Sequence, residues 1–261
     1  MPLRPHQTDA LDAMANHSKG QIIVPTGGGK TMCMIDDAKR LFNTQEFATI
    51  VVVAPRILLA EQLSSEFLEE IDDVDVMHVH SGETPHFSST KKDEIEDWWI
   101  GSEFCHKIIF TTYHSLHRIQ NSLISVDTIY FDEAHNSVNR NFFPATKFYG
   151  TRGASRCFFF TATPKHSLTP FKAGMNNTEV YGNVLINVPA PKLVKEGYIL
   201  PPKVEVYKSR LLRKDEIYAD VESEQMIGAI DKLEVDKVLI CAKSTKQIIG
   251  LLSQSDFCYE L

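Results

Sequence analysis

Three consecutive glycines separate a short apolar run from a segment with helical spacing. Residues 22–24, Ile-Ile-Val, predict a buried strand, and residues 30–41 predict an amphipathic helix. Glycine lets the backbone turn tightly and approach a ligand closely at low steric cost. The order of strand, glycine-rich turn and helix therefore predicts an anion-binding loop at residues 25–31, Pro-Thr-Gly-Gly-Gly-Lys-Thr.

The residue types in this loop suit a triphosphate. Backbone N–H groups of residues 27–29, together with the positive end of the following helix, can converge on phosphate oxygens. Lys30 would reach the β and γ phosphates, and the hydroxyl of Thr31 would bind magnesium. Val24 stands where the pattern G-x-x-x-x-G-K-[ST] has its first glycine, so the match is incomplete. A glycine-rich turn that binds no ligand is the alternative interpretation.

Composition limits the classes of protein to consider. A length of 261 residues predicts about two domains, and a hydrophobic fraction of 43% is ordinary for a globular chain. No apolar stretch approaches the roughly 18 residues that span a bilayer, and the amino terminus lacks a signal-peptide core. We therefore expect a soluble, cytoplasmic or other intracellular protein with no membrane partner. The net charge of −7 means that a polyanion would need a local basic strip.

Further apolar runs predict a sheet. They are residues 48–55, 74–80, 107–112, 126–131 and 157–160. Helical spacing separates several of them, and a first helix should begin near Pro5 with Leu11, Met14 and Ala15 on its apolar face. Unbroken apolar strands that alternate with helices are typical of the α/β class, with a parallel sheet covered by helices on both faces.

Polar motifs follow five of the predicted strands. They are residues 25–31, Ala-Pro-Arg at 54–56, Thr-Thr-Tyr-His at 111–114, Asp-Glu-Ala-His at 132–135 and Thr-Ala-Thr-Pro at 161–164. Because ligands of parallel sheets bind at the carboxyl ends of the strands, we expect all five motifs at one edge.

Asp132 and Glu133 emerge directly after a predicted buried strand. A magnesium ion that bridges phosphates prefers carboxylate oxygen, which favours Asp132 as its ligand. Hydrolysis also needs an oriented water that loses a proton, and Glu133 is the candidate base. Two acids that merely cap a helix N-terminus are the alternative.

Taken in order, the motifs resemble those of the first RecA-like domain of a superfamily 2 helicase or translocase with a DEAH box. They are RPHQ (4–7), PTGGGKT (25–31), APRILLAEQ (54–62), TTYHSL (111–116), DEAH (132–135) and TATP (161–164). The resemblance covers residues 1 to about 200. It implies an α/β fold of the RecA-like, P-loop NTPase type, and an ATP-dependent enzyme with ATP and Mg²⁺ as cofactors.

The resemblance also assigns roles to individual residues. The implied ATP site comprises Arg4, Gln7, Thr26, Gly27, Gly28, Gly29, Lys30 and Thr31, with Gln7 recognising adenine and Arg4 assisting it. The implied catalytic residues are Lys30, Asp132, Glu133 and His135, with Mg²⁺ on Thr31 and Asp132. Thr161 and Thr163 would couple the nucleotide to strand movement. Pro55, Arg56 and Thr112 would lie along nucleic-acid phosphates, which position a strand without reading its sequence.

The implied function is a motor that couples ATP hydrolysis to movement on, or unwinding of, DNA, with RNA less favoured. A nucleotide-dependent nucleic-acid-binding or regulatory module without motor activity is the alternative. Full affinity for ATP without turnover in the presence of nucleic acid would favour the alternative.

The resemblance to the first RecA-like domain ends at about residue 200. Residues 201–261 are interpreted as a linker and the incomplete start of a second RecA-like domain, with a strand at 237–242 and a helix from Ser244. Arg210 and Arg213 precede that strand, so they are poor candidates for the arginine that stabilises the transferring phosphoryl group. We therefore expect feeble hydrolysis by this chain, with a second polypeptide or a missing C-terminal segment supplying the other lobe.

Two smaller features have alternative interpretations. His78 and His80 share one face of a predicted strand, which suits either a metal pair or an ordinary strand end. Trp98 and Trp99 could stack on bases but are better explained as packing residues.

Overall fold

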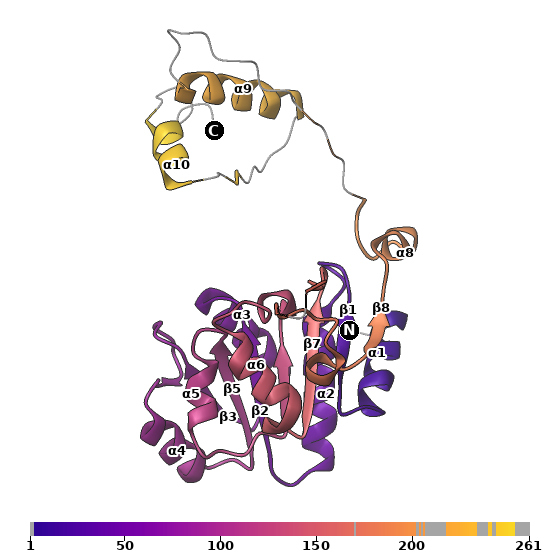
Figure 1. Cartoon of the computed structure of the whole chain (residues 1–261), viewed down its shortest axis with the longest axis vertical. Coiled ribbons are helices and arrows are strands. Elements are labelled where there is room, and N and C mark those ends of the chain that lie inside the picture. The colour runs from indigo at the N-terminus through magenta and orange to yellow at the C-terminus, as the bar shows by residue number, and fades with distance from the viewer. Residues whose placement is uncertain are drawn as a thin grey trace. The chain divides into compact units, whose positions relative to one another are not determined.

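The computed structural model describes residues 3–169, 171–201, 204, 206, 218–233, 240–241 and 244–253. The chain divides into two compact units, Met1–Pro201 and Pro202–Leu261. In the second unit the described helices are α9 (Tyr218–Leu233) and α10 (Thr245–Leu252), which contact each other (Figure 1). Helix α10 confirms the helix predicted from Ser244. Arg210, Arg213 and most of the predicted strand at 237–242 lie outside the described residues.

The first unit is built on one sheet, whose described strands are all parallel. The strands are β1 (Lys19–Ile23), β2 (Ala48–Ala54), β3 (Asp75–Val79), β4 (Phe87–Ser88), β5 (His106–Thr112), β6 (Thr128–Phe131), β7 (Arg156–Thr161) and β8 (Val184–Asn187). Their order across the sheet is β4-β3-β5-β2-β6-β7-β1-β8. The predicted α/β class is confirmed.

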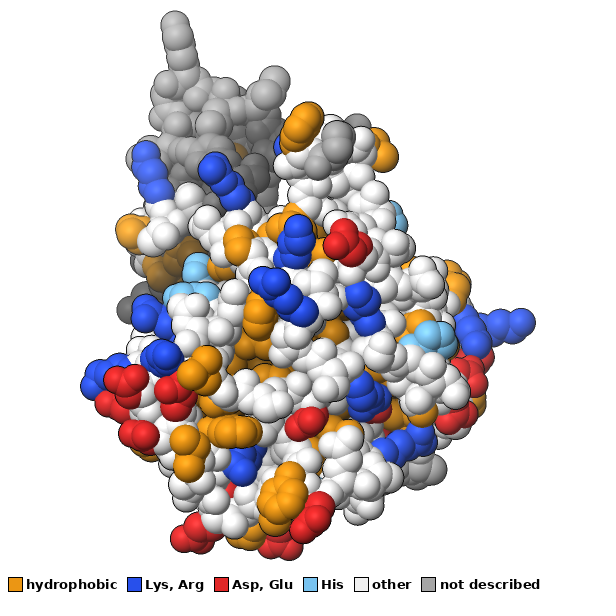
Figure 2. All heavy atoms as spheres, turned by 60° about the horizontal axis from the view of Figure 1, so that its bottom comes forward, with side chains coloured by type: hydrophobic (Ala, Val, Ile, Leu, Met, Phe, Trp, Pro, Cys, Tyr) orange, Lys and Arg blue, Asp and Glu red, His pale blue; other side chains and the backbone are white. Residues whose placement is uncertain are grey.

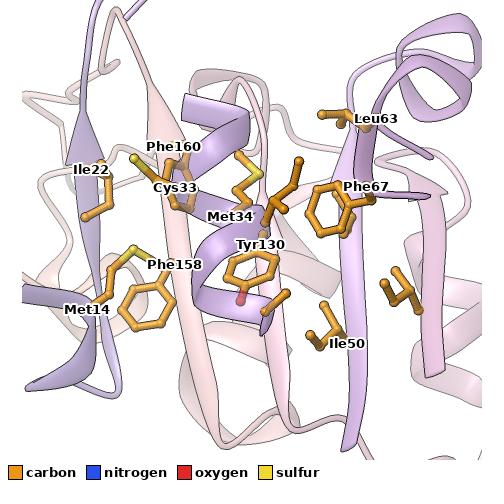
Figure 3. Packing of buried hydrophobic residues seen from close by; sticks show 14 of the residues in the cluster. Met14, Ile22, Cys33, Met34, Ile50, Leu63, Phe67, Tyr130, Phe158 and Phe160 are labelled. Atoms are coloured by element: carbon orange, nitrogen blue, oxygen red, sulfur yellow. The ribbon is translucent and has the colours of Figure 1, made fainter. Parts of the chain in front are cut away.

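Helices cover both faces of the sheet. One face is covered by α1 (Pro5–Ala15), α2 (Lys30–Thr44), α3 (Ile57–Leu68) and α8 (Ala190–Lys195). The other is covered by α4 (Lys92–Gly101), α5 (Leu116–Asn121), α6 (Phe143–Phe148), the π-helix Tyr149–Gly153 and α7 (Thr178–Tyr181). Side chains of β2 alternate between the two cores: Ile50 and Val52 join the first, and Val51 and Val53 join the second. Figure 3 shows part of the first core, with Met34 of α2 beside Tyr130 of β6.

Helix α1 begins where the sequence predicts, at Pro5. Its buried face carries His6, Gln7, Ala10, Leu11 and Met14. The expectation that Ala15 joins this face is wrong, because the buried positions follow the 3–4 residue spacing from 7 to 14 and the next residue turns to solvent.

Strand β1 begins three residues earlier than predicted, at Lys19. Polar residues at this end hide the strand in the sequence, but Gln21 is buried and its side-chain Nε2 donates to the carbonyls of Met175 and Gly182. These hydrogen bonds offset the cost of burying an amide. They also fasten β1 to the segment that leads into the edge strand β8.

A buried ion pair joins α2 to the middle of the sheet. Asp37 accepts from Arg156 Nη2 at 2.7 Å and from the hydroxyl of Tyr130 at 2.5 Å. Burial of the ring, followed by the charge of Asp37 and the hydrogen bond to it, raises the pKa of Tyr130 well above its usual value. The predicted phosphate loop lies between β1 and α2, so this pair helps to fix the helix behind the loop.

In the part of the chain that the structure describes, no helix is both long and apolar enough to cross a membrane.

Candidate nucleotide site at the carboxyl edge of the sheet

The five motifs meet at one edge, as predicted. The strands that carry them are consecutive in the order β5-β2-β6-β7-β1, and all five run in the same direction. Residues 161–164 therefore lie between the acids at 132–133 and the glycines at 27–29. This order brings the ends of β6, β7 and β1 together in the middle of the edge.

The glycine-rich loop needs its glycines for definite reasons. Gly27 and Gly29 have φ of 76° and 83°, the left-handed region that residues with a side chain rarely adopt. Gly28 has no such φ, but a Cβ there would lie 2.4 Å from Val24 Cγ1. Val24, where the common pattern has glycine, is thus packed against Gly28 in the core.

The carbonyls of all three glycines are held by the RPHQ segment. Arg4 Nη1 donates to the oxygen of Gly27 at 3.0 Å, and Gln7 Nε2 donates to that of Gly29 at 3.1 Å. Between them, His6 Nε2 lies 2.7 Å from the oxygen of Gly28. A carbonyl can only accept, so this nitrogen carries the proton.

This arrangement sets the polarity of the loop. The three successive carbonyls bond to side chains of residues 4, 6 and 7, and the backbone N–H of Gly28 donates to the carbonyl of Pro25 at 3.0 Å. Because a trans peptide holds its N–H opposite its carbonyl, the peptides that follow Gly28 and Gly29 direct their N–H groups to the other side of the loop, where they can receive an anion. Helix α2 starts directly behind, with Gly29 as its N-cap residue. Thr31 is half-buried in the first turn of α2, while Thr26 and Gly27 are exposed.

His6 was not found by sequence reasoning. Its position between Arg4 and Gln7, two residues of one motif, was the sequence signal that could have identified it as part of the site. Gln7 itself is 5% exposed, and its Oε1 accepts from the backbone N–H of Arg4 at 2.7 Å. Both ends of its amide therefore bond to this chain, and adenine recognition by Gln7 stays a prediction.

Residues 193–199 form an outer wall to the loop. The ring of Tyr198 lies edge-on to His6 at 5.8 Å and carries the guanidinium of Arg4 at 5.1 Å from its centroid. Leu193 is buried beside Gly28, and a Cβ on Gly27 would lie 3.4 Å from Ile199. No local sequence pattern predicts this wall, which lies in the passage toward the second unit.

All of the predicted catalytic and coupling residues except Asp132 form one connected series. Lys30 Nζ lies 3.8 Å from Glu133 Oε1, and Glu133 Oε2 lies 3.3 Å from His135 Nδ1. His135 Nδ1 is 3.0 Å from the hydroxyl oxygen of Thr161, and that oxygen accepts from the backbone N–H of Thr163 at 3.1 Å. The series thereby links the phosphate loop to the TATP motif, two segments distant in sequence.

Glu133 holds an unusual backbone conformation. Its φ of 44° is left-handed, and a non-glycine residue there stores strain of order 1–3 kcal/mol. The hydroxyl of the buried Tyr113 donates to the carbonyl of Asp132 at 2.8 Å, which fixes the peptide on the N-terminal side. Sequence reasoning did not assign a role to Tyr113, although it lies within the TTYHSL motif.

The electrostatics of the acids favour a cation. Burial, followed by the charge of Glu133, raises the pKa of Asp132 to about 6. The carboxylate of Asp132 makes no ion pair with any described residue. A buried acid with a like-charged neighbour is stabilised by a divalent ion, so Asp132 and the hydroxyl of Thr31 suit a hard, oxygen-seeking metal such as Mg²⁺.

The surroundings of His135 disfavour its charged form. Burial lowers its pKa, and the charges of Lys165 and Lys30 act in the same direction, against the opposing effect of Glu133. A neutral imidazole can donate from one nitrogen only. Its Nδ1 faces both Glu133 and Thr161, so the two side chains share one imidazole nitrogen.

The residues predicted to contact nucleic acid differ in exposure. Arg56 is exposed at the start of α3 and Pro55 is half-buried. Thr112 is 4% exposed, so its side chain presents little surface to a ligand in this conformation.

His78 and His80 do not form a metal site with a third ligand among the described residues. Instead His78 Nδ1 faces His80 Nε2 at 2.9 Å, and its Nε2 faces the hydroxyl of Ser64 at 3.1 Å. Trp98 packs against the second core, and Trp99 donates from Nε1 to the hydroxyl of Thr49, as expected for packing residues.

A parallel sheet with a glycine-rich loop, a lysine at the next helix start and an acid pair two strands away defines a P-loop domain with the RecA-like fold of helicases. The comparisons narrow this class. The family model described as type III restriction enzyme, res subunit, matches residues 1–166. The chain belongs to this helicase-like family. No curated protein matches it.

Solved structures share the fold. One is a nuclease-deletion mutant of the Type ISP restriction-modification enzyme LlaGI in complex with a DNA substrate mimic (TM-score 0.60, 19% identity), covering 90% of this chain and 23% of that one. The ATP-dependent Type ISP enzyme LlaBIII bound to DNA (0.62, 18%) covers 76% and 16%. The UvsW helicase from bacteriophage T4 (0.50, 14%) covers 70% and 60%. This chain thus spans less than a quarter of the length of either restriction enzyme.

Proposed function

We propose that this chain carries the ATP-binding domain of a DNA translocase or helicase, with residues 132–135 as its DEAH box. The observation that carries the proposal is the connected series from Lys30 through Glu133 and His135 to Thr161 and Thr163. A nucleotide-driven motor requires a carboxylate that acts as the general base and a lysine that binds phosphate. It also requires a group that connects the nucleotide site to the rest of the domain. The family match and the DNA-bound solved structures support DNA over RNA.

Each residue has a defined part in the proposed reaction. The loop N–H groups and Lys30 bind and orient the triphosphate, and Glu133 takes a proton from the attacking water. Thr31 and Asp132 would hold Mg²⁺, which would neutralise charge on the phosphates. His135, whose Nδ1 faces both side chains, would couple a change at Glu133 to Thr161. Arg56, exposed at the same edge, would contact a phosphate of the bound strand.

The second unit, residues 202–261, is proposed as the start of a second RecA-like lobe. A complete second lobe would contribute the arginine that stabilises the transferring phosphoryl group.

The test is ATPase activity measured without polymer and with single-stranded DNA, duplex DNA and RNA. We expect Lys30→Ala to abolish nucleotide binding, while Glu133→Gln retains binding and loses turnover. Lys39→Ala serves as the control for the first, because Lys39 lies on the same helix but pairs with Glu70. Unchanged nucleotide affinity in Lys30→Ala would refute the proposal. Tight ATP binding without turnover under every polymer would favour a regulatory module instead.

A further inference from the structure

The sequence after the DEAH motif is unusual in its charge. Residues 134–178 contain no Asp or Glu, although the whole chain has a net charge of −7. The cations in this stretch are Arg140, Lys147, Arg152, Arg156, Lys165 and Lys172. Arg156 is taken up by the buried pair with Asp37, and the others remain for the surface. A local basic strip of this kind is what an acidic chain needs to hold a polyanion.

Three of these cations line one groove. The groove has a volume of about 920 Å³ and lies between residues 138–147, which include most of α6, and residues 167–169 and 171–177. Arg140 and Lys147 line it from one side and Lys172 from the other. None of the three forms an ion pair with a described Asp or Glu. Figure 2 shows one face of the molecule, on which Lys and Arg side chains occupy the centre while most Asp and Glu lie toward the lower and lateral margins.

The wall formed by residues 167–169 and 171–177 is held together by internal hydrogen bonds. Asn176 Oδ1 accepts from the backbone N–H of Ser167 at 2.9 Å, and its Nδ2 donates to the carbonyl of Ser167 at 2.9 Å. The backbone N–H of Met175 donates to the carbonyl of Lys165 at 2.8 Å. Gly174 is required where the two ends meet, since a Cβ there would lie 2.4 Å from Ser167 N. The two ends of the wall are therefore held together next to the TATP motif.

Apolar side chains stand beside the cations. Phe171 is 97% exposed and Leu168 is fully exposed, and Phe143 also lines the groove. Large apolar side chains left this exposed incur a hydration cost unless a ligand covers them. The groove is lined by cations and an exposed aromatic ring, and the described residues of its lining include no carboxylate. Such a lining suits a ligand that has regularly spaced anionic groups and flat apolar groups. Single-stranded nucleic acid has both, because phosphates bind Lys and Arg and unpaired bases stack on aromatic rings.

We propose that this groove is a second nucleic-acid contact, which binds single-stranded nucleic acid through phosphates at Arg140, Lys147 and Lys172 and through a base stacked on Phe171. The inference rests on the proposed motor function and extends it. Both walls follow motifs of the nucleotide site, the first after residues 132–135 and the second after residues 161–164. A strand held here would lie against segments continuous with His135 and Thr163.

The test uses the full chain and a fluorescently labelled oligothymidylate, with binding followed by anisotropy over a series of salt concentrations. We expect the triple variant Arg140→Ala, Lys147→Ala, Lys172→Ala to lose about 10-fold or more in affinity at low salt. Its slope of log affinity against log salt should fall by about 2, since each phosphate contact to a single strand contributes about 0.7. Phe171→Ala should lose about 5-fold, and Phe171→Trp should restore the affinity.

The matched control removes three cations that already have partners. Lys39, Arg40 and Lys92 pair with Glu70, Asp12 and Glu96, so Lys39→Ala, Arg40→Ala, Lys92→Ala gives the same change in net charge. We expect the control to keep its affinity. Equal losses in the two triple variants would overturn the proposal, because they would report net charge and not a site.

Two further results separate this inference from the function on which it rests. If the wild-type chain binds the oligonucleotide and the groove variant binds it equally well, the groove is refuted and the motor proposal stands. If polyglutamate of the same charge binds as tightly and is equally weakened by the groove variant, the ligand is an acidic peptide and the nucleic-acid assignment is wrong. A wild-type chain that binds no nucleic acid would overturn both.

Discussion

Replacing Gly29 by alanine tests the account of the phosphate loop. Two costs are expected. A left-handed φ of 83° costs an alanine about 1–2 kcal/mol. In addition, the new Cβ would lie 2.3 Å from Gln7 Nε2, so Gln7 must move and its hydrogen bond to the carbonyl of Gly29, worth about 1 kcal/mol, is lost. The free energy of unfolding should therefore fall by about 2–3 kcal/mol.

Two other glycines separate these costs. Gly197 has a φ of 76°, and a Cβ added there would have no neighbour within 4 Å, so Gly197→Ala should lose only the backbone cost of about 1–2 kcal/mol. Gly101 has neither a positive φ nor a neighbour, so Gly101→Ala should leave stability within about 0.5 kcal/mol. In a Gln7→Ala background, Gly29→Ala should cost no more than Gly197→Ala does.

Urea unfolding followed by tryptophan fluorescence is a suitable assay. The chain has two tryptophans, Trp98 and Trp99, and both lie in α4 of the first unit, so the signal reports on the unit that holds the loop. The reasoning is refuted if Gly29→Ala costs no more than Gly197→Ala, or if removing Gln7 leaves the cost of Gly29→Ala unchanged. Either result would mean that Gln7 does not hold the loop.

Three other predictions concern buried polar groups. Arg156→Ala should lower the free energy of unfolding by about 3–5 kcal/mol, because it leaves the buried carboxylate of Asp37 without its cation, whereas the exposed Arg152→Ala should cost under about 1 kcal/mol by the same urea assay. Burial, followed by the charges of His80 and His86, lowers the pKa of His78 to about 4 from 6.5. The unfolded chain therefore binds this proton at higher pH than the folded chain, and up to about 3 kcal/mol of stability should be lost as pH falls from 6.5 to 4. His78→Gln should flatten that part of the stability profile, and an unchanged slope would show that His78 is not its source. Tyr113→Phe removes the hydrogen bond to the carbonyl of Asp132 and should lower the rate of ATP turnover while leaving nucleotide affinity within about 2-fold, which steady-state kinetics with a direct binding measurement would check.

The sheet could be predicted wherever a strand is buried on both faces. Residues 48–55 are all apolar or β-branched apart from Pro55, and every residue of β2 is buried, so the sequence pattern and the structure agree. Strand β8 could not be predicted in this way, because Val184 and Asn187 at its ends are exposed and an edge strand needs no continuous apolar run. The two-residue strand β4 is exposed and leaves no signal in the sequence at all.

The site divides in the same way. Lys30, Glu133, His135 and Thr161 could be placed at one edge because each follows a recognisable strand and because the parallel order is a general rule. His6 contacts the carbonyl of Gly28, and Tyr113 donates to the carbonyl of Asp132. Each contact joins segments that are distant in sequence, and no local pattern encodes such contacts. Tyr198 contacts Arg4, although the two residues lie near opposite ends of the sequence of the first unit, so only the folded chain reveals the pairing.

Residues 4, 6 and 7 bond to the carbonyls of the three loop glycines, and this has a consequence for grafting the loop into another protein. Transplanting residues 25–31 into another sheet would move the glycines without the groups that orient them, and the peptide planes would be free to rotate. The transferable unit is the pair of segments 3–7 and 25–31, which are separate in sequence but act as one part. A substitution in either segment should be compensated, if at all, by a change in the other.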